Sequence, residues 1–426
     1  MSFLDKLESK YSKNLKLKQN FLSSLVIFII AIPLSIGIAM ASGTSPTSAL
    51  IAAIIGGLVV GIFSGAPLLV SGPAAGLSAL VFQLVQQHGL EALPIIVVSA
   101  GIFQILFSAL RAGKLFEYFP MSALEGMLAA IGIIILFGQF HVMLGQSVPS
   151  NVLSSIYTFS DSFLKMIKTN QYHILFLGIV GLMIQRFWGN IVPKLSWIPS
   201  ALPAVIFVTI ISLSFTLPRV ELAPFGSESL IIFKQVLAGG WISNWPGLIL
   251  AGFLMSIVAS AETLLTARAV DQIALEKKHL KLQANLNKEL FAQGLGNSIS
   301  GLLGGLPLTG VIVRSAANVH AGATNRLSTI FHGLLVLLFI SFLPWTLEYI
   351  PLTVLASVLV MTGIKLLNIG KLFSTFKQSK LDGSVWVATM VAIMVFGLLQ
   401  GLVLGVTVHF ACRFIRDQKS KFLSET

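Results

Sequence analysis

Residues 304–322, GGLPLTGVIVRSAANVHAG, place a proline, several glycines and an arginine inside a strongly apolar chain. A membrane-spanning helix avoids such residues, because a charged side chain at the bilayer centre costs at least about 2.5 kcal/mol. Glycine and proline also interrupt helices and leave backbone groups that need hydrogen-bond partners. The stretch therefore predicts a broken helix at membrane depth, where its backbone must face protein, water or a bound ligand.

The composition of the whole chain is that of a multi-pass membrane protein in a lipid bilayer. Of its 426 residues, 55% are hydrophobic and only 10% are charged, whereas soluble domains carry about 25% charged residues. The formal net charge is +12, but the lysines and arginines are scattered between apolar runs, so we expect no nucleic-acid partner. The single Cys412 excludes an internal disulfide.

Apolar runs long enough to span a membrane recur along the chain. The uninterrupted runs lie at 21–42, 47–65, 93–111, 121–138, 172–188, 198–217, 246–267, 326–343, 351–366 and 383–415. Three further segments, 66–87, 289–304 and 306–321, are interrupted by glycine or proline. Because the run 383–415 is long enough for two short spans that meet at LLQGLV, the sequence predicts an all-α membrane protein of about fourteen spans.

The basic residues predict the orientation of these spans. If both termini are cytoplasmic, 23 of the 28 lysines and arginines lie on the inner side, four lie outside, and Arg314 lies within a span. Cytoplasmic loops carry such an excess of positive charge. We therefore expect both termini in the cytoplasm, in the cytoplasmic membrane of a bacterium. Residues 364–380 are expected to form an amphipathic helix on the inner surface, and 151–169 one on the outer surface.

A second interrupted segment, LLVSGPAAGLSALVF at 68–82, follows the same scheme as the first, and Pro73 aligns with Pro307. Proline suits the first turn of a helix, so both segments are expected to be helices that start in mid-membrane. Such a start carries free NH donors and roughly half a positive charge. Two of them in corresponding halves are typical of a transporter's central site between inverted repeats. The expected ligand is an anion, and Arg314 adds positive charge beside it.

Glu262, in SIVASAETLLTAR, is the other charge expected inside the membrane. A carboxylate in the middle of a span is by default functional, and Thr266 lies four residues on, on the same helix face. Glu262 would carry a proton, or bind Na⁺ with Thr266 and carbonyls near Gly310. A static salt bridge from Glu262 to Arg314 or Arg268 is the structural alternative. No other metal site and no bound cofactor are expected.

The sequence at 287–333, NKELFAQGLGNSISGLLGGLPLTGVIVRSAANVHAGATNRLSTIFHG, resembles the most characteristic stretch of the sulfate permease (SulP) family, as do AETLLTA before it and VSGPAAGLSALV near the N-terminus. This resemblance covers about residues 20–412. It implies two inverted seven-span repeats with core and gate domains, usually dimeric, that move the substrate by an elevator-like shift. The implied organisation is an N-terminal tail at 1–20, repeats at 21–217 and 246–412, an extracellular connection at 218–245, and a C-terminal tail at 413–426.

The resemblance also implies a set of site residues. Backbone NH groups in both interrupted segments match family positions that face the anion. They belong to Ala74, Ala75 and Gly76 in the first segment and to Val311, Ile312 and Val313 in the second. Arg314 matches the family's arginine. Glu262 matches the acidic position that the family links to proton or sodium coupling.

Two departures from the family pattern affect the expected substrate. The chain ends without the STAS domain that members commonly carry, and AIPLSIGIA has Leu34 where glutamine is common. Short members with this variant are often presumed to carry bicarbonate, some in association with a carbonic anhydrase, whereas the family name argues for sulfate. Both substrates stay open.

The sequence thus predicts a secondary active transporter of sulfate or bicarbonate coupled to H⁺ or Na⁺. The alternative is an exchanger or channel-like carrier of chloride or a dicarboxylate on the same fold. An enzyme is not expected, because the chain has no HExxH motif and no GxSxG elbow. Polar residues around the second break are expected to act structurally: Asn287 and Glu289 as helix caps, and Gln293, Asn297 and Asn318 as links between the interrupted helices.

Overall fold

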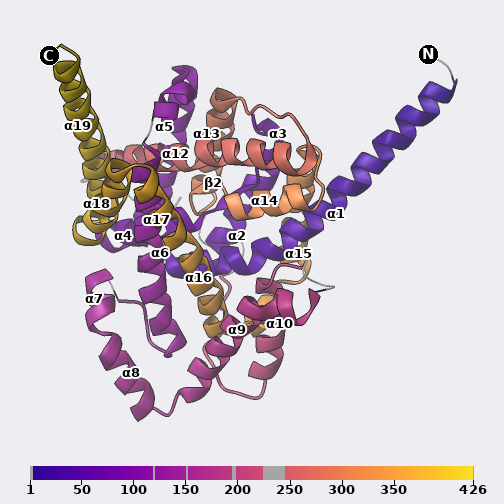
Figure 1. The fold of residues 1–426 in the computed structure, drawn as a ribbon. Coiled ribbons are helices and arrows are strands. Elements are labelled where there is room, and N and C mark those ends of the chain that lie inside the picture. The colour runs from indigo at the N-terminus through magenta and orange to yellow at the C-terminus, as the bar shows by residue number, and fades with distance from the viewer. Residues whose placement is uncertain (1–2, 119, 150–151, 194–197, 224–244, 426) are drawn as a thin grey trace.

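The computed structural model describes residues 3–118, 120–149, 152–193, 198–223 and 245–425, and Figure 1 shows that they are almost entirely helical. The first half contains α1 (Phe3–Ala41), α2 (Pro46–Ile55), the π-helix η1 (Gly56–Val60), α3 (Gly61–Phe63), β1 (Ser71–Pro73), α4 (Ala75–His88), η2 (Leu90–Ala92), α5 (Leu93–Ala109), η3 (Ala112–Tyr118), α6 (Met121–Met143), α7 (Val152–Tyr157), α8 (Phe159–Lys168), α9 (Tyr172–Ile191) and α10 (Ala201–Ser212). The second contains α12 (Trp245–Lys278), α13 (Leu286–Leu302), β2 (Leu308–Gly310), α14 (Ile312–His320), α15 (Leu327–Phe342), η6 (Pro344–Tyr349), α16 (Leu352–Leu367), α17 (Ile369–Gln378), α18 (Lys380–Phe396) and α19 (Leu398–Glu425).

Among the described residues, seven helical segments are long and apolar enough to cross a membrane. They are Lys16–Ala41, Pro46–Phe63, Leu90–Ala109, Met121–Met143, Tyr172–Ile191, Trp245–Lys278 and Leu352–Gln378. Helices α4, α10, α13, α14, α15, α18 and α19 occupy the other predicted segments, and most of them are shorter than a full span. The run 383–415 is divided at Gly397, whose φ of 91° ends α18, one residue before the predicted LLQGLV junction.

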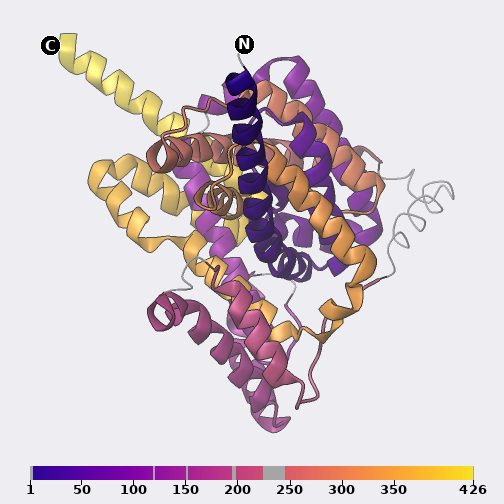
Figure 2. The same cartoon turned by 90° about the vertical axis from the view of Figure 1, so that its right-hand side faces the viewer.

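The predicted tails are continuous with spans. Helix α1 begins at Phe3, so most of the expected tail 1–20 extends the first span as helix, and α19 likewise runs through 413–425. In both Figure 1 and Figure 2 the two ends of the chain project from the same end of the molecule, and Figure 1 places α8 at the opposite end. Most of the predicted connection 218–245 lies outside the described residues.

The centre of the molecule is a two-stranded antiparallel sheet made from the two interrupted segments. Strand β1 pairs with β2 so that Ser71 faces Gly310 and Pro73 faces Leu308. Each strand leads directly into a short helix, α4 or α14, and Figure 1 shows these helices on opposite sides of β2. The sheet joins segments that are more than 200 residues apart in the chain and satisfies extended backbone that would otherwise be costly at membrane depth.

The prediction that proline opens both short helices was wrong. Pro73 is the last residue of β1, and Pro307 precedes β2. Proline fixes φ near the value of extended backbone and has no NH to donate, so it also fits the strand that precedes a helix. The corresponding N-cap residues are Ala74 and Val311, both with extended backbone angles.

Small residues let the helices around this centre approach closely. A Cβ at Gly57, in η1, would lie 2.5 Å from the Cα of Gly333 in α15. A Cβ at Gly294, in α13, would lie 2.7 Å from the carbonyl oxygen of Gly101 in α5. Such small-residue contacts are a usual means of packing helices in membranes, where apolar burial between helices gives little driving force.

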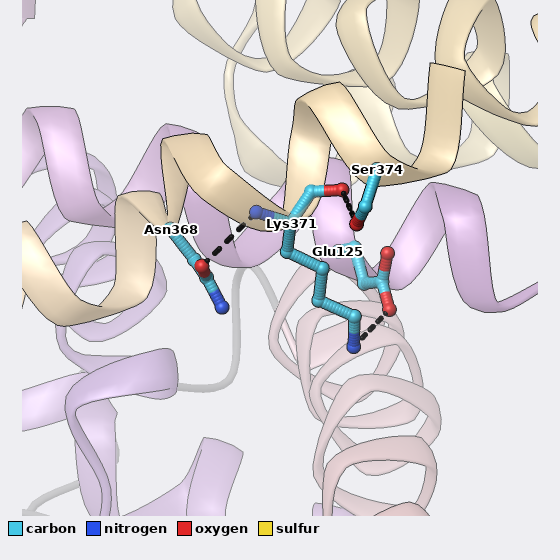
Figure 3. Close-up of polar contacts among 4 residues, drawn as sticks. All are labelled: Glu125, Asn368, Lys371 and Ser374. Atoms are coloured by element: carbon cyan, nitrogen blue, oxygen red, sulfur yellow. Dashed lines mark hydrogen bonds and ion pairs between the residues drawn. The ribbon is translucent and has the colours of Figure 1, made fainter. Parts of the chain in front are cut away.

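Helix α17 lies on the surface of the molecule, between α16 and α18, within the predicted amphipathic segment 364–380. Asn368, with a left-handed φ of 37°, ends α16 and caps α17 by accepting a hydrogen bond from the NH of Lys371. The Lys371 ammonium forms an ion pair with Glu125 of α6 at 2.6 Å (Figure 3). The predicted surface segment 151–169 contains α7 and α8.

Candidate functional site

The candidate site lies where α4 and α14 begin, on either side of the strand pair. Neither helix has a side chain that caps its N-terminus, and the first NH groups of a helix have no partner within it. The two predicted sets of backbone donors occupy the same positions in both helices, namely the N-cap and the first two helical residues. Ile312 and Val313 are 38% and 44% exposed, so the start of α14 is open on one side.

One of the predicted donors is not free. The NH of Val311 donates to the carbonyl of Val70 at 2.9 Å and so extends the pairing of the two segments. The prediction that the Val311 NH faces an anion was therefore wrong. The predicted donors that remain are the NH groups of Ile312 and Val313 in α14 and those of Ala74, Ala75 and Gly76 at the start of α4.

Arg314 is fully buried and only partly satisfied. Its Nη2 donates to the hydroxyl of Ser35 in α1 at 2.9 Å, while Nε and Nη1 have no hydrogen-bond partner among the described residues. The guanidinium lies against β1, because a Cβ at Gly72 would be 2.6 Å from Nη1. A buried charge normally has an ionic partner, and no acidic side chain lies within 4.0 Å of Arg314 in the described part of the chain.

Glu262 of α12 reaches the start of α4. A Cβ at Gly76 would lie 2.5 Å from Oε1 of Glu262. Oε2 is buried and has no hydrogen-bond partner in the part of the chain that the structure describes. The structural alternative was a static salt bridge from Glu262 to Arg314. These two described residues form no salt bridge, because no N···O distance between them is within 4.0 Å. Thr266 is buried on the same helix. The acidic group is thus held beside the positive end of a helix.

Polar side chains hold the broken backbone in place, as predicted for three of them. Asn297 donates to the carbonyl of Leu308 and accepts from its NH. Asn318 donates to the carbonyl of Leu68 at 3.0 Å, and Gln293 donates to the hydroxyl of Ser71 at 2.7 Å. These bonds fix both strands and the lead-in to β1.

Sequence reasoning missed two hydroxyl side chains of the site. Thr263 accepts a hydrogen bond from the NH of Gly310 at 3.0 Å, so α12 positions the end of β2 as well as the Glu262 carboxylate. Ser35 is adjacent to Leu34, whose departure from the family pattern drew attention to this turn of α1. Its small hydroxyl gave no separate signal, because serine is common in packed membrane helices.

The capping prediction for Asn287 and Glu289 was wrong. Asn285 caps α13, while Asn287 accepts from the NH of Gly113. Glu289 is fully buried and accepts from the hydroxyl of Ser64 at 2.6 Å and from the NH groups of Gly65 and Ala66. It thereby gives the hydrogen-bond donors of the turn between α3 and the lead-in to β1 an acceptor.

A cavity of about 570 Å³ lies beside α4. Its lining combines Ser78, Phe82 and three glutamines of α4 with residues of α6 and of the α18–α19 junction, where Gly397 lies. Ser78 is on the first turn of α4, so the cavity extends to within one helical turn of the candidate site. Its amide and hydroxyl groups carry no charge.

Comparison with known sequences supports a transport role. The model of the sulfate permease family matches residues 17–389. The chain is 27% identical over 410 residues to the putative sulfate transporter YvdB of Bacillus subtilis, covering 94% of this chain and 74% of that protein. It is 24% identical over 364 residues to the bicarbonate transporter BicA of a Picosynechococcus species, covering 83% of this chain and 62% of that protein.

The fold also matches a solved structure. The transmembrane domain of a cyanobacterial bicarbonate transporter, BicA, superposes with a TM-score of 0.78 at 24% sequence identity, covering 91% of this chain and 97% of that domain. This likeness confirms the predicted fold class, an all-α membrane protein of inverted repeats with two half-helices at its centre.

Proposed function

The chain belongs to the sulfate permease family, and from that premise we propose that it is a secondary active transporter of a small inorganic anion, sulfate or bicarbonate, coupled to H⁺ or Na⁺. Members of this family are transporters and not enzymes, as the sequence predicted. The observation that carries the proposal is the pair of uncapped helix starts, α4 and α14, on either side of the central strand pair.

The anion binds between these helix starts. It accepts hydrogen bonds from the NH groups of Ala74, Ala75 and Gly76 on one side and of Ile312 and Val313 on the other. It also faces the positive ends of both helix dipoles. Arg314 contributes positive charge from its position against β1, where its guanidinium has no ionic partner among the described residues. Because backbone donors do not distinguish one small oxyanion from another, sulfate and bicarbonate both fit this chemistry.

Glu262 links the anion to a cation gradient. A carboxylate beside Gly76 repels an anion at the same helix start, and this repulsion is removed when Glu262 takes up a proton or a sodium ion. For sodium, Thr266 and the backbone near Gly310 are the additional oxygen ligands. Cation and anion therefore bind together, which is the requirement for symport.

The cavity beside α4 gives the anion a route to the site. Its neutral amides and hydroxyls offer hydrogen bonds along the way without trapping the ion by charge. We place both termini in the cytoplasm, since they project from one end of the molecule and the basic loops favour that side. A homodimer in a bacterial cytoplasmic membrane completes the proposal, and a bicarbonate substrate would make a carbonic anhydrase its functional partner.

Uptake into liposomes tests this function. The purified protein is reconstituted, and uptake of labelled sulfate and of labelled bicarbonate is measured with an imposed proton gradient, with a sodium gradient, and with neither. Saturable uptake of one anion driven by one gradient identifies the substrate and the coupling ion. Uptake that ignores both gradients but requires a counter-anion inside the vesicle favours the exchanger alternative, and uptake confined to chloride or a dicarboxylate contradicts the proposed substrate.

A further inference from the structure

Helix α17 is a basic amphipathic helix that the rest of the described chain covers only in part. None of its ten residues is buried. Ile369 and Phe373, four residues apart on one face, are 54% and 63% exposed. It connects the end of α16 to the start of α18, so it lies at the level where two spans leave the bilayer.

The charge of this segment has one sign. Residues 364–380, IKLLNIGKLFSTFKQSK, contain four lysines and no acidic residue. Lys371 is the lysine with an ionic partner, Glu125 of α6, whose side chain is only 16% exposed (Figure 3). Lys377 and Lys380 are exposed and form no salt bridge with any acidic residue of the described chain.

We propose that α17 is a binding surface for anionic phospholipid headgroups. Ile369 and Phe373 enter the acyl region, as the apolar face of an interfacial helix does. Lys365, Lys377 and Lys380 then face the phosphates. Glu125 fixes the orientation of the helix through Lys371, so that the apolar face and the free lysines are presented to the same leaflet.

Helix α8 provides an internal comparison. It has the same amphipathic form and exposes Phe163 and Leu164, but its two lysines share the helix with Asp161. Near an anionic surface each uncompensated lysine strengthens binding about fivefold. Helix α17 should therefore bind anionic lipid in preference to zwitterionic lipid, whereas α8 should show only a weak preference between the two.

Quenching by spin-labelled lipid tests the proposal on the intact protein. In a Cys412→Ser background, Gln378→Cys on α17 or Ser160→Cys on α8 is labelled with bimane, and the protein is reconstituted in phosphatidylcholine vesicles. Spin-labelled phosphatidylglycerol and spin-labelled phosphatidylcholine are compared as quenchers. We expect phosphatidylglycerol to be preferred severalfold at position 378 and to be nearly equal to phosphatidylcholine at position 160.

Charge variants separate headgroup binding from ordinary lipid contact. Lys377→Gln with Lys380→Gln should lower the preference at position 378 to nearly equal quenching by the two lipids, because two of the uncompensated lysines are removed. Glu125→Gln should raise the preference by leaving Lys371 uncompensated. Equal quenching by the two lipids at position 378 with both lysines in place, or a preference that persists in the double lysine variant, would overturn the proposal. The lysine variants keep the Lys371–Glu125 pair, so this test holds even if Glu125→Gln does not fold.

Discussion

The contact between Glu262 and Gly76 sets the distance between the proposed coupling group and the proposed anion. The sequence identified Glu262, because a carboxylate in the middle of an apolar helix has few structural reasons to be there. The sequence did not identify the contact, because a glycine at position 76 is equally consistent with close helix packing. Only the fold brings α12 against the first turn of α4.

Replacing Gly76 with alanine should therefore impair transport without unfolding the protein. The new methyl group would overlap the end of the Glu262 side chain, which is able to rotate away, so the carboxylate would leave the helix start. We expect gradient-driven uptake to fall at least about tenfold, with an unchanged melting temperature. Gly189→Ala, where a Cβ meets no atom within 4 Å, is the matched control, and wild-type uptake in Gly76→Ala would refute the proposed geometry.

The hydroxyl of Ser35 is the hydrogen-bond partner of the Arg314 guanidinium. A hydrogen bond to a charged group contributes about 1.5–3 kcal/mol, so Ser35→Ala should raise the KM for the anion roughly tenfold or more as the guanidinium loses its position. Ser24→Ala on the same helix, where the hydroxyl bonds only to its own helix backbone, should leave KM unchanged. Equal KM values for Ser35→Ala and Ser24→Ala would show that the hydroxyl does not position Arg314.

At the scale of elements, the two interrupted segments were predictable and their pairing was not. The glycines and prolines marked where helices stop, because these residues disfavour helix regardless of context. The antiparallel register of Ser71 with Gly310 depends on segments distant in sequence and on the bonds that Asn297 and Gln293 supply. Aligning Pro73 with Pro307 therefore matched positions that do not correspond in the structure, because Pro73 ends β1 whereas Pro307 precedes β2.

The turn before β1 depends on Glu289 for its hydrogen bonds. A glutamine at this position offers one acceptor oxygen in place of two and introduces an amide that the donors of Ser64, Gly65 and Ala66 do not satisfy. We expect Glu289→Gln to lower stability by about 2–3 kcal/mol, measured as a lower melting temperature in detergent. Glu348→Gln, at an exposed position, is the control, and identical melting temperatures would contradict the assigned role.

At the scale of the whole molecule, the fold agrees with the prediction that both termini lie on one side of the membrane, and the basic loops predict that this side is the cytoplasm. Both termini project from one end, and α8 lies at the other. In vesicles of known orientation, without native Cys412, Ser160→Cys should react with a membrane-impermeant maleimide from outside, whereas Gln378→Cys should react only after the inner face is exposed. Labelling of both positions from the same side would overturn the predicted topology.

The central claim is that Glu262 couples a cation to an anion held at the starts of α4 and α14. Its most direct test compares wild type and Glu262→Gln in liposomes by gradient-driven uptake and by counterflow of the same labelled anion. A glutamine removes the titrating and cation-binding group but leaves the helix starts intact. The account predicts that gradient-driven uptake is lost while counterflow persists, and gradient-driven uptake at the wild-type rate in Glu262→Gln would contradict it.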